Sequence, residues 1–202
     1  MNVLSAVMSA FVQLGLVLVL PVAWWAFTAR GRLDFATWIG LHMPRWRVNR
    51  RRTVAAVLAW VLISTASIML LRSLGEDVAA SRFAGMGLAG VVPVTLHALV
   101  QTGLSEEIFF RGFLGKRLIA GFGFAIGNVV QALVFGLVHV GFFASSATPT
   151  RLALIGVITA ANAWIMGWIN ERCAGGSIVP SWMLHSTVNL AVGLGAAFTL
   201  PT

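Results

Sequence analysis

Long apolar runs recur along the whole chain, and this pattern restricts the fold more than any other feature. The sequence has 202 residues, of which 58% are hydrophobic and 10% are charged. Soluble domains average about 25% charged residues, so this chain is not one of them. Backbone polar groups in lipid must be satisfied within the chain, so repeated apolar runs of about 20 residues predict membrane helices. We therefore expect an all-α, polytopic transmembrane helical bundle.

About six apolar segments are expected to cross the membrane. They are residues 3–27, 53–71, 84–117, 122–143, 152–169 and 179–200. The third segment is long for one span, so it is either one tilted helix or two pieces broken near Thr102 and Gly103. Gly121, Gly123 and Gly127 allow the fourth span to begin late, because glycine tolerates a break in the helix.

Charge divides the chain into two parts. Residues 1–83 contain the first two spans and a basic loop at 28–52 that carries seven arginines. This loop is compatible with an amphipathic helix in the interface and equally with a solvated basic loop. Residues 84–202 contain the remaining spans and the polar residues described below. We expect these residues to form the functional core.

The distribution of positive charge predicts the topology. With six spans, ten of the fourteen lysines and arginines lie in loops on one side of the membrane. The positive-inside rule makes that side cytoplasmic, so both termini should face outward. The net charge of +8 is then explained by orientation and by contact with anionic lipid. No motif for binding nucleic acid accompanies the arginines.

Ser105 to Arg111 places two acids and one base inside an apolar segment. Charged side chains within a membrane span are costly and usually mark a function. Glu107 and Arg111 are four residues apart, so they share one helix face and can form an ion pair that fixes the helix. Glu106 points about a quarter turn away and is left free for chemistry. The alternative is that both glutamates pair with Arg111 and serve only the packing of the helices.

Two histidines on other spans extend this polar set. His139 follows Phe135 by four residues, and His185 precedes Asn189 by four, so each pair shares a helix face. A single histidine in a membrane helix is more often structural, and we interpret His97 in that way. Glu106, His139, His185 and Asn189, however, lie on three different helices, and each can face the interior of a bundle. We therefore expect these polar side chains to form one site there.

Hydrolysis by an activated water is the chemistry that these residues favour. A carboxylate and an imidazole around one water can act as a general base. A second histidine and an asparagine can donate hydrogen bonds to a developing oxyanion. The alternative use of Glu106, His139 and His185 is a zinc site with one open position. No zinc-binding motif of the His-Glu-x-x-His kind is present.

The order of these motifs resembles a known family of intramembrane proteases. Glu-Glu-x-x-x-Arg at 106–111, Phe-x-x-x-His at 135–139 and His-x-x-x-Asn at 185–189 are similar to the CAAX protease and bacteriocin-processing (CPBP) family. That family includes the type II CAAX prenyl endopeptidases and the Abi proteins. The resemblance covers residues 84–200 approximately. It implies an intramembrane endopeptidase that cleaves a peptide bond, without implying prenylated substrates in particular.

The resemblance also implies a role for each residue. Glu106 would be the base that activates water, and His139 would help to hold the water. His185 and Asn189 would stabilise the oxyanion. Members of the family have been described both as metalloproteases and as metal-independent glutamate proteases. We favour the second description, with no cofactor, and keep zinc as the alternative.

The expected setting follows from the same interpretation. The protein should be a multi-pass protein of the bacterial inner (plasma) membrane, with a membrane-associated peptide or protein as substrate and lipid as its surroundings. Water is expected to reach the site from the cytoplasmic side. The alternative function is a non-proteolytic membrane factor that serves in immunity or as a scaffold.

Overall fold

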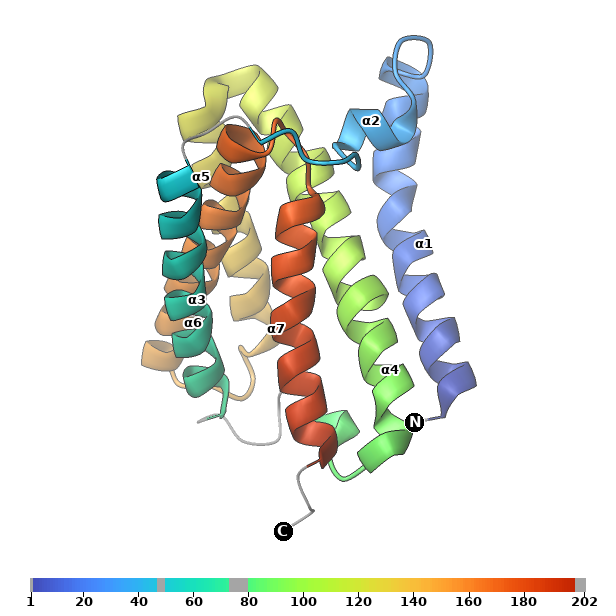
Figure 1. Ribbon diagram of the computed structural model, residues 1–202, viewed down its shortest axis with the longest axis vertical. Coiled ribbons are helices and arrows are strands. Elements are labelled where there is room, and N and C mark those ends of the chain that lie inside the picture. The colour runs from blue at the N-terminus through green and yellow to red at the C-terminus, as the bar shows by residue number, and fades with distance from the viewer. Residues whose placement is uncertain (1, 47–49, 73–79, 199–202) are drawn as a thin grey trace.

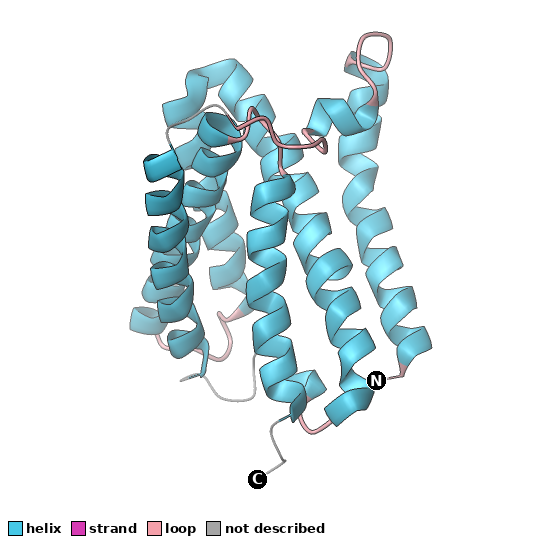
Figure 2. Ribbon diagram, in the orientation of Figure 1, coloured by secondary structure: helices cyan, strands magenta, loops and turns pink. Residues whose placement is uncertain are grey.

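The protein is a bundle of helices in the computed structural model, which describes residues 2–46, 50–72 and 80–198 (Figures 1 and 2). No strand occurs in these ranges. The α-helices are α1 (Val3–Thr28), α2 (Phe35–Ile39), α3 (Arg50–Arg72), α4 (Val91–Leu96), α5 (Lys116–Phe142), α6 (Pro149–Trp168) and α7 (Val179–Phe198). Short 3-10 helices form η2 (Ser81–Phe83) and η3 (Gly87–Gly90), and π-helices form η4 (His97–Leu104), η5 (Glu107–Gly115) and η6 (Ile169–Cys173). The predicted all-α bundle is confirmed.

Parts of three predicted segments lie outside the described residues. They are 47–49 in the basic loop, 73–79 in the next loop and 199–202 at the end of the last span.

Four stretches of the described chain are long and apolar enough to cross a membrane, namely Val3–Thr28, Arg50–Leu70, Gly87–Phe142 and Pro149–Cys173. The third stretch contains a break at Gly123, where two helices meet, and therefore supplies two crossing arms. Helix α7 is of similar length but is not among the four, because the polar residues along it lower its mean hydropathy. With α7, the described chain contains the six crossing pieces that the sequence predicts.

The reversal inside α5 depends on glycine. Gly123 has φ 76° and ψ 166°, a conformation that other residues rarely adopt. Gly127 then packs directly on the preceding arm, since a Cβ atom there would lie 2.5 Å from the backbone nitrogen of Ile119. The second arm thus begins after Gly123, which agrees with the predicted late start. This start brings His139 to the depth of the other polar residues.

Replacing Gly123 by alanine should destabilise the protein by about 1–3 kcal/mol, because the backbone there has a positive φ. Gly121→Ala is the matched control. A Cβ atom added at either position would have no other atom within 4 Å, so the two variants differ in backbone strain and not in space. Thermal unfolding in detergent measures the effect. Equal melting temperatures for the two variants would contradict the strained turn.

The segment between Gly87 and Gly123 is one continuous helix, so the predicted alternative of a break near Thr102 is wrong. Instead, the helix widens into the π-helix η4. Gly103 lets α7 approach this widened segment closely, since a Cβ atom at Gly103 would lie 2.4 Å from Oγ of Ser186. The close approach carries residues of α7 to the residues of η4 and η5.

The basic segments meet at one end of the bundle, and both termini lie at the other (Figure 1). Nζ of Lys116 lies 2.9 Å from Oε1 of Glu171, and the guanidinium of Arg117 stacks 3.9 Å from the ring of Trp38. Trp38 belongs to α2, a five-residue helix capped by Asp34 and packed on the bundle. The grouping of the basic loops agrees with the predicted topology, and the assignment of this end to the cytoplasm stays a prediction.

Large apolar side chains cover the outer surfaces of α1 and α3. Leu16 is 70% exposed, Leu62 is 72% exposed and Phe27 is 90% exposed. Such surfaces would be costly in water but are favourable against lipid chains. The polar residues of the core lie on the inner faces instead. The protein is therefore an integral membrane protein.

Candidate active site

A buried ion pair anchors the polar centre of the bundle. Glu107 and Arg111 lie on η5 and are 0% and 3% exposed. Nη1 of Arg111 lies 3.0 Å from Oε1 of Glu107, which confirms the predicted pair. The Arg111 guanidinium also lies over the ring of Phe135, 4.2 Å from its centroid. The carboxylate and the ring together compensate a cation that is almost fully buried.

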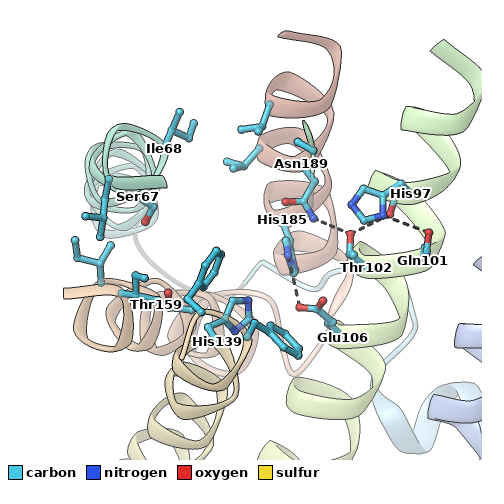
Figure 3. A pocket seen from close by; sticks show the side chains of 18 of the residues that line it. Ser67, Ile68, His97, Gln101, Thr102, Glu106, His139, Thr159, His185 and Asn189 are labelled. Carbon is cyan, nitrogen blue, oxygen red and sulfur yellow. Dashed lines mark hydrogen bonds and ion pairs between the residues drawn. The ribbon is translucent and has the colours of Figure 1, made fainter. Parts of the chain in front are cut away.

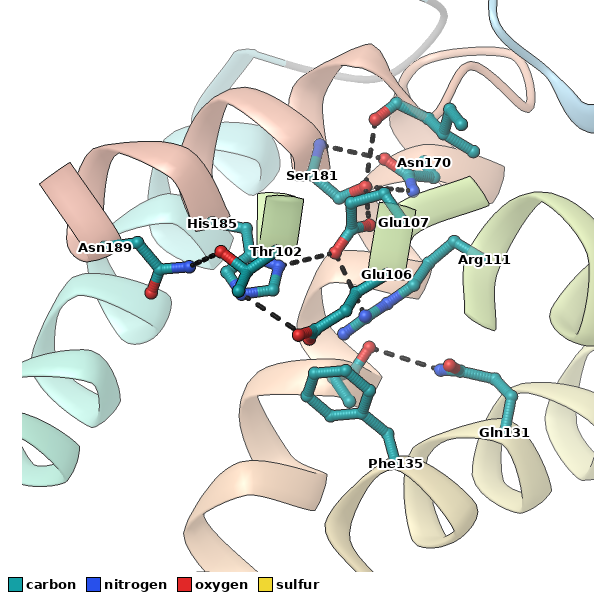
Figure 4. A network of polar contacts seen from close by, with 12 residues as sticks. Thr102, Glu106, Glu107, Arg111, Gln131, Phe135, Asn170, Ser181, His185 and Asn189 are labelled. Atoms are coloured by element: carbon teal, nitrogen blue, oxygen red, sulfur yellow. Dashed lines mark hydrogen bonds and ion pairs between the residues drawn. The ribbon is translucent and has the colours of Figure 1, made fainter. Parts of the chain in front are cut away.

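Glu107 is held from α7 as well as from its own helix. The hydroxyl of Ser181 donates to Oε2 of Glu107, and Nδ2 of Asn170 donates to the same hydroxyl (Figure 4). Nδ1 of His185 lies 3.1 Å from Oε1 of Glu107. This carboxylate therefore joins three helices, and its hydrogen-bonding capacity is used for structure.

Glu106, unlike Glu107, has a carboxylate oxygen that no described residue holds by a hydrogen bond. Its Oε2 atom is buried and has no hydrogen-bond partner among the described residues, although its side chain is 19% exposed. The nearest basic group is Nε2 of His185, at 3.9 Å from Oε2 (Figure 3). This distance is too long for a direct hydrogen bond and lets one water molecule contact both atoms. Glu106 thus lies outside the ion pair with Arg111, and its use for chemistry stays a prediction.

The neighbours of the two histidines define which nitrogen carries a proton. A carboxylate only accepts, so Nδ1 of His185 donates to Glu107. A backbone carbonyl also only accepts, so Nδ1 of His139 donates to the carbonyl of Phe135, 2.9 Å away. In each ring, Nε2 is the nitrogen that remains for chemistry. Both histidines line the same cavity as Glu106.

Asn189 is positioned by a hydrogen bond from its own amide. Its Nδ2 donates to Oγ1 of Thr102 over 2.8 Å, and Thr102 donates to the backbone carbonyl of His97 over 2.9 Å. One N–H bond of the Asn189 amide is used in this way. The other N–H bond is available to a ligand in the cavity, because Asn189 also lines it.

These residues enclose a cavity of about 490 Å³ between α3, α5, α6, α7 and η4 (Figure 3). One part of its wall is polar and includes Glu106, His139, His185 and Asn189. Much of the remaining lining is apolar and consists of Ile68, Leu70, Phe142, Phe143, Ile155, Ile158, Val188 and Val192. The volume is in the range of ligand sites. It can accept an apolar side chain next to a polar backbone.

The cavity extends toward the end of the bundle that carries the termini. Arg82 and Ala80 belong to its wall, whereas no described residue of the basic loop does. We expected water to arrive from the cytoplasmic side, and this route stays a prediction. At the basic end, Lys116 contacts Glu171, and α2 packs on the bundle.

A comparison with protein families matches residues 88–191 to the type II CAAX prenyl endopeptidase Rce1-like family. The matched segment is just over half of the chain. The chain belongs to this family. No curated protein and no solved structure matches it.

The Rce1-like segment contains all three predicted motifs and leaves α1 and α3 outside. Helix α1 still contributes to the cavity, because Gln13 lines it and donates to the backbone carbonyl of Gln101 over 2.8 Å. The predicted boundary between residues 1–83 and 84–202 stays a prediction. The first span nevertheless has a structural role that the sequence did not assign.

The alternative zinc ligands do not gather around one point. No group of three His, Cys, Asp or Glu side chains in the described ranges is close enough to hold a metal ion. Glu106 and His185 approach each other, but His139 does not complete a three-ligand set. A zinc site needs its ligands at about 2.0–2.3 Å from a common centre. The expected absence of a cofactor stays a prediction, with zinc as its alternative.

Sequence reasoning missed several residues around the predicted site. Ser181 holds Glu107, and a signal for it exists in the sequence, because Ser181, His185 and Asn189 are spaced by four along one face of α7. Thr102 had no such signal, because its contact with Asn189 depends on the approach of α7 to the π-helix η4. Widened helices of this kind often occur at functional sites.

Replacing Thr102 by valine should lower kcat about tenfold with a small change in KM. Valine keeps the shape of threonine but offers no acceptor to Asn189, so the amide loses its orientation. Thr102→Ser restores the hydroxyl and should recover most of the rate. Steady-state kinetics of the three proteins measure the effect. An unchanged kcat for the valine variant would show that this hydrogen bond does not position Asn189 for the reaction.

Proposed function

We propose that the protein is an intramembrane endopeptidase that hydrolyses a peptide bond by direct attack of water. The observation that carries this proposal is Oε2 of Glu106, a buried carboxylate oxygen without a hydrogen-bond partner in the described chain. Buried polar atoms are almost always paired, so an unpaired one beside a cavity indicates a place for water or substrate. Membership of the Rce1-like endopeptidase family supports the same reaction class.

In the proposed reaction, Glu106 is the general base. It takes a proton from a water molecule while the water oxygen attacks the carbonyl carbon of the peptide bond. The carbonyl electron pair moves to oxygen and forms an oxyanion. As the C–N bond breaks, the proton passes from Glu106 to the leaving nitrogen, and the carboxylate is restored. No bond to the protein forms in this sequence.

His185 and Asn189 are proposed to stabilise the oxyanion. Asn189 has one N–H bond left for this purpose, since the other binds Thr102. His185 can donate from Nε2 only as an imidazolium, because Nδ1 already donates to Glu107. With His185 protonated, Glu106, Glu107, Arg111 and His185 form a set of two anions and two cations. Such a balance reduces the cost of charge in the bundle interior.

His139 is proposed to hold the attacking water. Its Nδ1 proton is used by the carbonyl of Phe135, so Nε2 has a free lone pair. That lone pair can accept a hydrogen bond from the water proton that Glu106 does not take. The ring of Phe135 lies 4.4 Å from the imidazole and restricts its rotation. Phe135 would therefore support the site through both His139 and Arg111.

The proposed substrate is a membrane-associated protein or peptide. The apolar wall of the cavity supports a substrate with apolar side chains, and the polar wall supports an exposed peptide bond. Prenylation of the substrate is not required by these features. We propose the inner membrane of a bacterium as the location, with the basic end of the bundle facing the cytoplasm.

The proposal is tested by reconstituting the purified full chain in nanodiscs and incubating it with a library of apolar peptides. Mass spectrometry identifies any products, and a reaction in ¹⁸O-labelled water shows whether the new carboxyl group contains oxygen from water. Glu106→Gln serves as the inactive reference. Equal product formation by both proteins would overturn the proposal, as would trapping of an acyl-protein intermediate by hydroxylamine.

We also propose that the reaction needs no metal. Hydrolysis is expected to continue after treatment with a zinc chelator, and zinc in the purified protein should be well below one equivalent. The support for this proposal is that no group of three potential metal ligands in the described ranges is close enough to hold a metal ion. One bound zinc per chain, together with loss of hydrolysis on chelation and recovery on adding zinc, would replace this mechanism.

A further inference from the structure

A second polar cluster lies in the cavity wall, away from Glu106. It consists of Arg82, His97 and Gln101, and all three side chains line the cavity. Arg82 belongs to η2, which Phe83 anchors because its side chain is 0% exposed and packs with Val94. The guanidinium of Arg82 lies 4.9 Å from the centroid of the Phe83 ring. The position of Arg82 is therefore fixed by the fold, although its own side chain is exposed.

The contacts of Arg82 with described residues include no anion. Its Nη2 atom is near Nδ1 of His97 and lies 3.5 Å from Oε1 of Gln101, and both of these groups are neutral acceptors. No described carboxylate lies within ion-pair distance of Arg82. By contrast, Arg111 pairs with Glu107. Arg82 thus differs from the cations of the bundle that hold a structural ion pair.

The neighbours of Arg82 are themselves oriented. The Gln101 amide nitrogen donates to Oγ of Ser9 over 2.8 Å and to Oε1 of Gln13 over 3.1 Å. Because these bonds fix the amide, Oε1 of Gln101 has to face Arg82 and His97. Both contacts of Arg82 are made by Nη2, so the donors on Nη1 and Nε remain free of described hydrogen-bond partners. The cationic guanidinium can therefore give a charge-assisted hydrogen bond to a carboxylate from one of these free donors.

The cluster lies on the same helix as the proposed base. His97 and Glu106 are nine residues apart along η4 and its continuation. At the ~1.5 Å per residue of an α-helix this separation would be about 13 Å, and the wider π-helix η4 makes it somewhat shorter. An extended peptide covers that distance in about four residues at ~3.3 Å each. A substrate with its scissile bond at Glu106 would then place a group near Arg82 about four residues away.

We propose that Arg82, supported by His97 and Gln101, is a subsite for a carboxylate of the substrate. The carboxylate would be either the C-terminal carboxylate or the side chain of an aspartate or glutamate. The subsite would select substrates with a negative charge at a fixed distance from the cleaved bond. This inference rests on the proposed peptide hydrolysis and adds a specificity to it.

The test uses the full-length protein in nanodiscs and apolar peptides made in three forms. The forms are the free acid, the C-terminal amide, and the amide with one aspartate at successive positions. For the wild-type protein, the acid form or one aspartate position should have a kcat/KM at least tenfold above the plain amide, mainly through KM. The form that gains identifies the source of the carboxylate.

Arg82→Gln should lower that acid-to-amide ratio at least tenfold, because the glutamine is neutral. Arg82→Lys should retain part of the ratio, since the charge remains but the planar set of guanidinium donors is lost. Arg151→Gln is the matched control, because Arg151 is exposed at the start of α6 and does not line the cavity. It should keep the wild-type ratio. A wild-type ratio in Arg82→Gln overturns the subsite.

Two further outcomes show whether the subsite or the proposed peptide hydrolysis is wrong. If Arg82→Gln changes the dependence of activity on phosphatidylglycerol and leaves the ratio unaltered, the arginine serves lipid and the subsite is wrong. If no peptide is cleaved at all, the proposed function fails, and the subsite is then tested by binding. Affinities of the acid and amide peptides for Glu106→Gln protein, with and without Arg82→Gln, provide that test. Equal affinities would overturn the subsite independently of hydrolysis.

Discussion

Replacing Glu106 by glutamine is expected to lower kcat by about 10³-fold or more while leaving the protein folded. Loss of a general base typically costs 10²- to 10⁴-fold. Glutamine has nearly the same shape as glutamate but cannot accept a proton from water. The buried Oε2 atom has no hydrogen-bond partner in the described chain, so its replacement breaks no hydrogen bond and loses only the 3.9 Å approach to Nε2 of His185. The melting temperature should therefore change little.

The measurement combines peptide hydrolysis with thermal unfolding in the same detergent. Glu106→Asp is an informative companion, because it keeps the carboxylate and withdraws it by one methylene group. It should retain more activity than the glutamine variant. A folded Glu106→Gln protein with more than about a tenth of the wild-type kcat would exclude Glu106 as the base.

Replacing the adjacent Glu107 should mainly lower stability, whereas replacing Glu106 should mainly lower activity. Glu107→Gln leaves the Arg111 charge buried without its partner, and breaking such a pair costs about 3–5 kcal/mol. We expect a large fall in melting temperature and a strong decrease in the amount of folded protein. Loss of activity would follow from loss of the fold. Of the two neighbouring carboxylates, Glu106 would thus serve the reaction and Glu107 the stability of the fold.

The double variant Glu107→Gln, Arg111→Met tests this interpretation. Removing both charges of a buried pair is often neutral or even stabilising, so much of the lost stability should return. Hydrolysis should remain impaired, because His185 no longer has a carboxylate at Nδ1. Thermal unfolding and kcat are measured on both variants and the wild type. A double variant as unstable as Glu107→Gln would mean that Ser181 and His185, rather than Arg111, account for the stability.

The sequence predicts the local pairings of this site well. Glu107 and Arg111 meet because a spacing of four residues brings side chains together on any helix of this kind. Gly123 breaks α5 because its backbone conformation excludes most other residues. Both predictions need only information from a few adjacent residues. The number of crossing segments follows in the same way from the lengths of the apolar runs.

Contacts between distant segments are less accessible to sequence reasoning. His97 was interpreted as a bland structural residue, although it contacts Arg82 and lines the cavity. Nothing in the spacing of residues 82 and 97 predicts this contact, because it depends on how η2 folds back under α7. The π-helices were missed for a related reason. The sequence predicts a regular helical period throughout, whereas the widened segment η4 lies where Gly103 lets α7 approach closely.

The hydrogen bonds between α1 and η4 have a consequence for how the protein is made. Ser9 and Gln13 find their partner, Gln101, about ninety residues later in the chain. During synthesis, the first helix therefore reaches the bilayer before its polar side chains can be satisfied. We expect it to wait beside the insertion machinery rather than diffuse away into lipid. Crosslinking of ribosome-bound chains should detect this delay, and Gln13→Leu should shorten it.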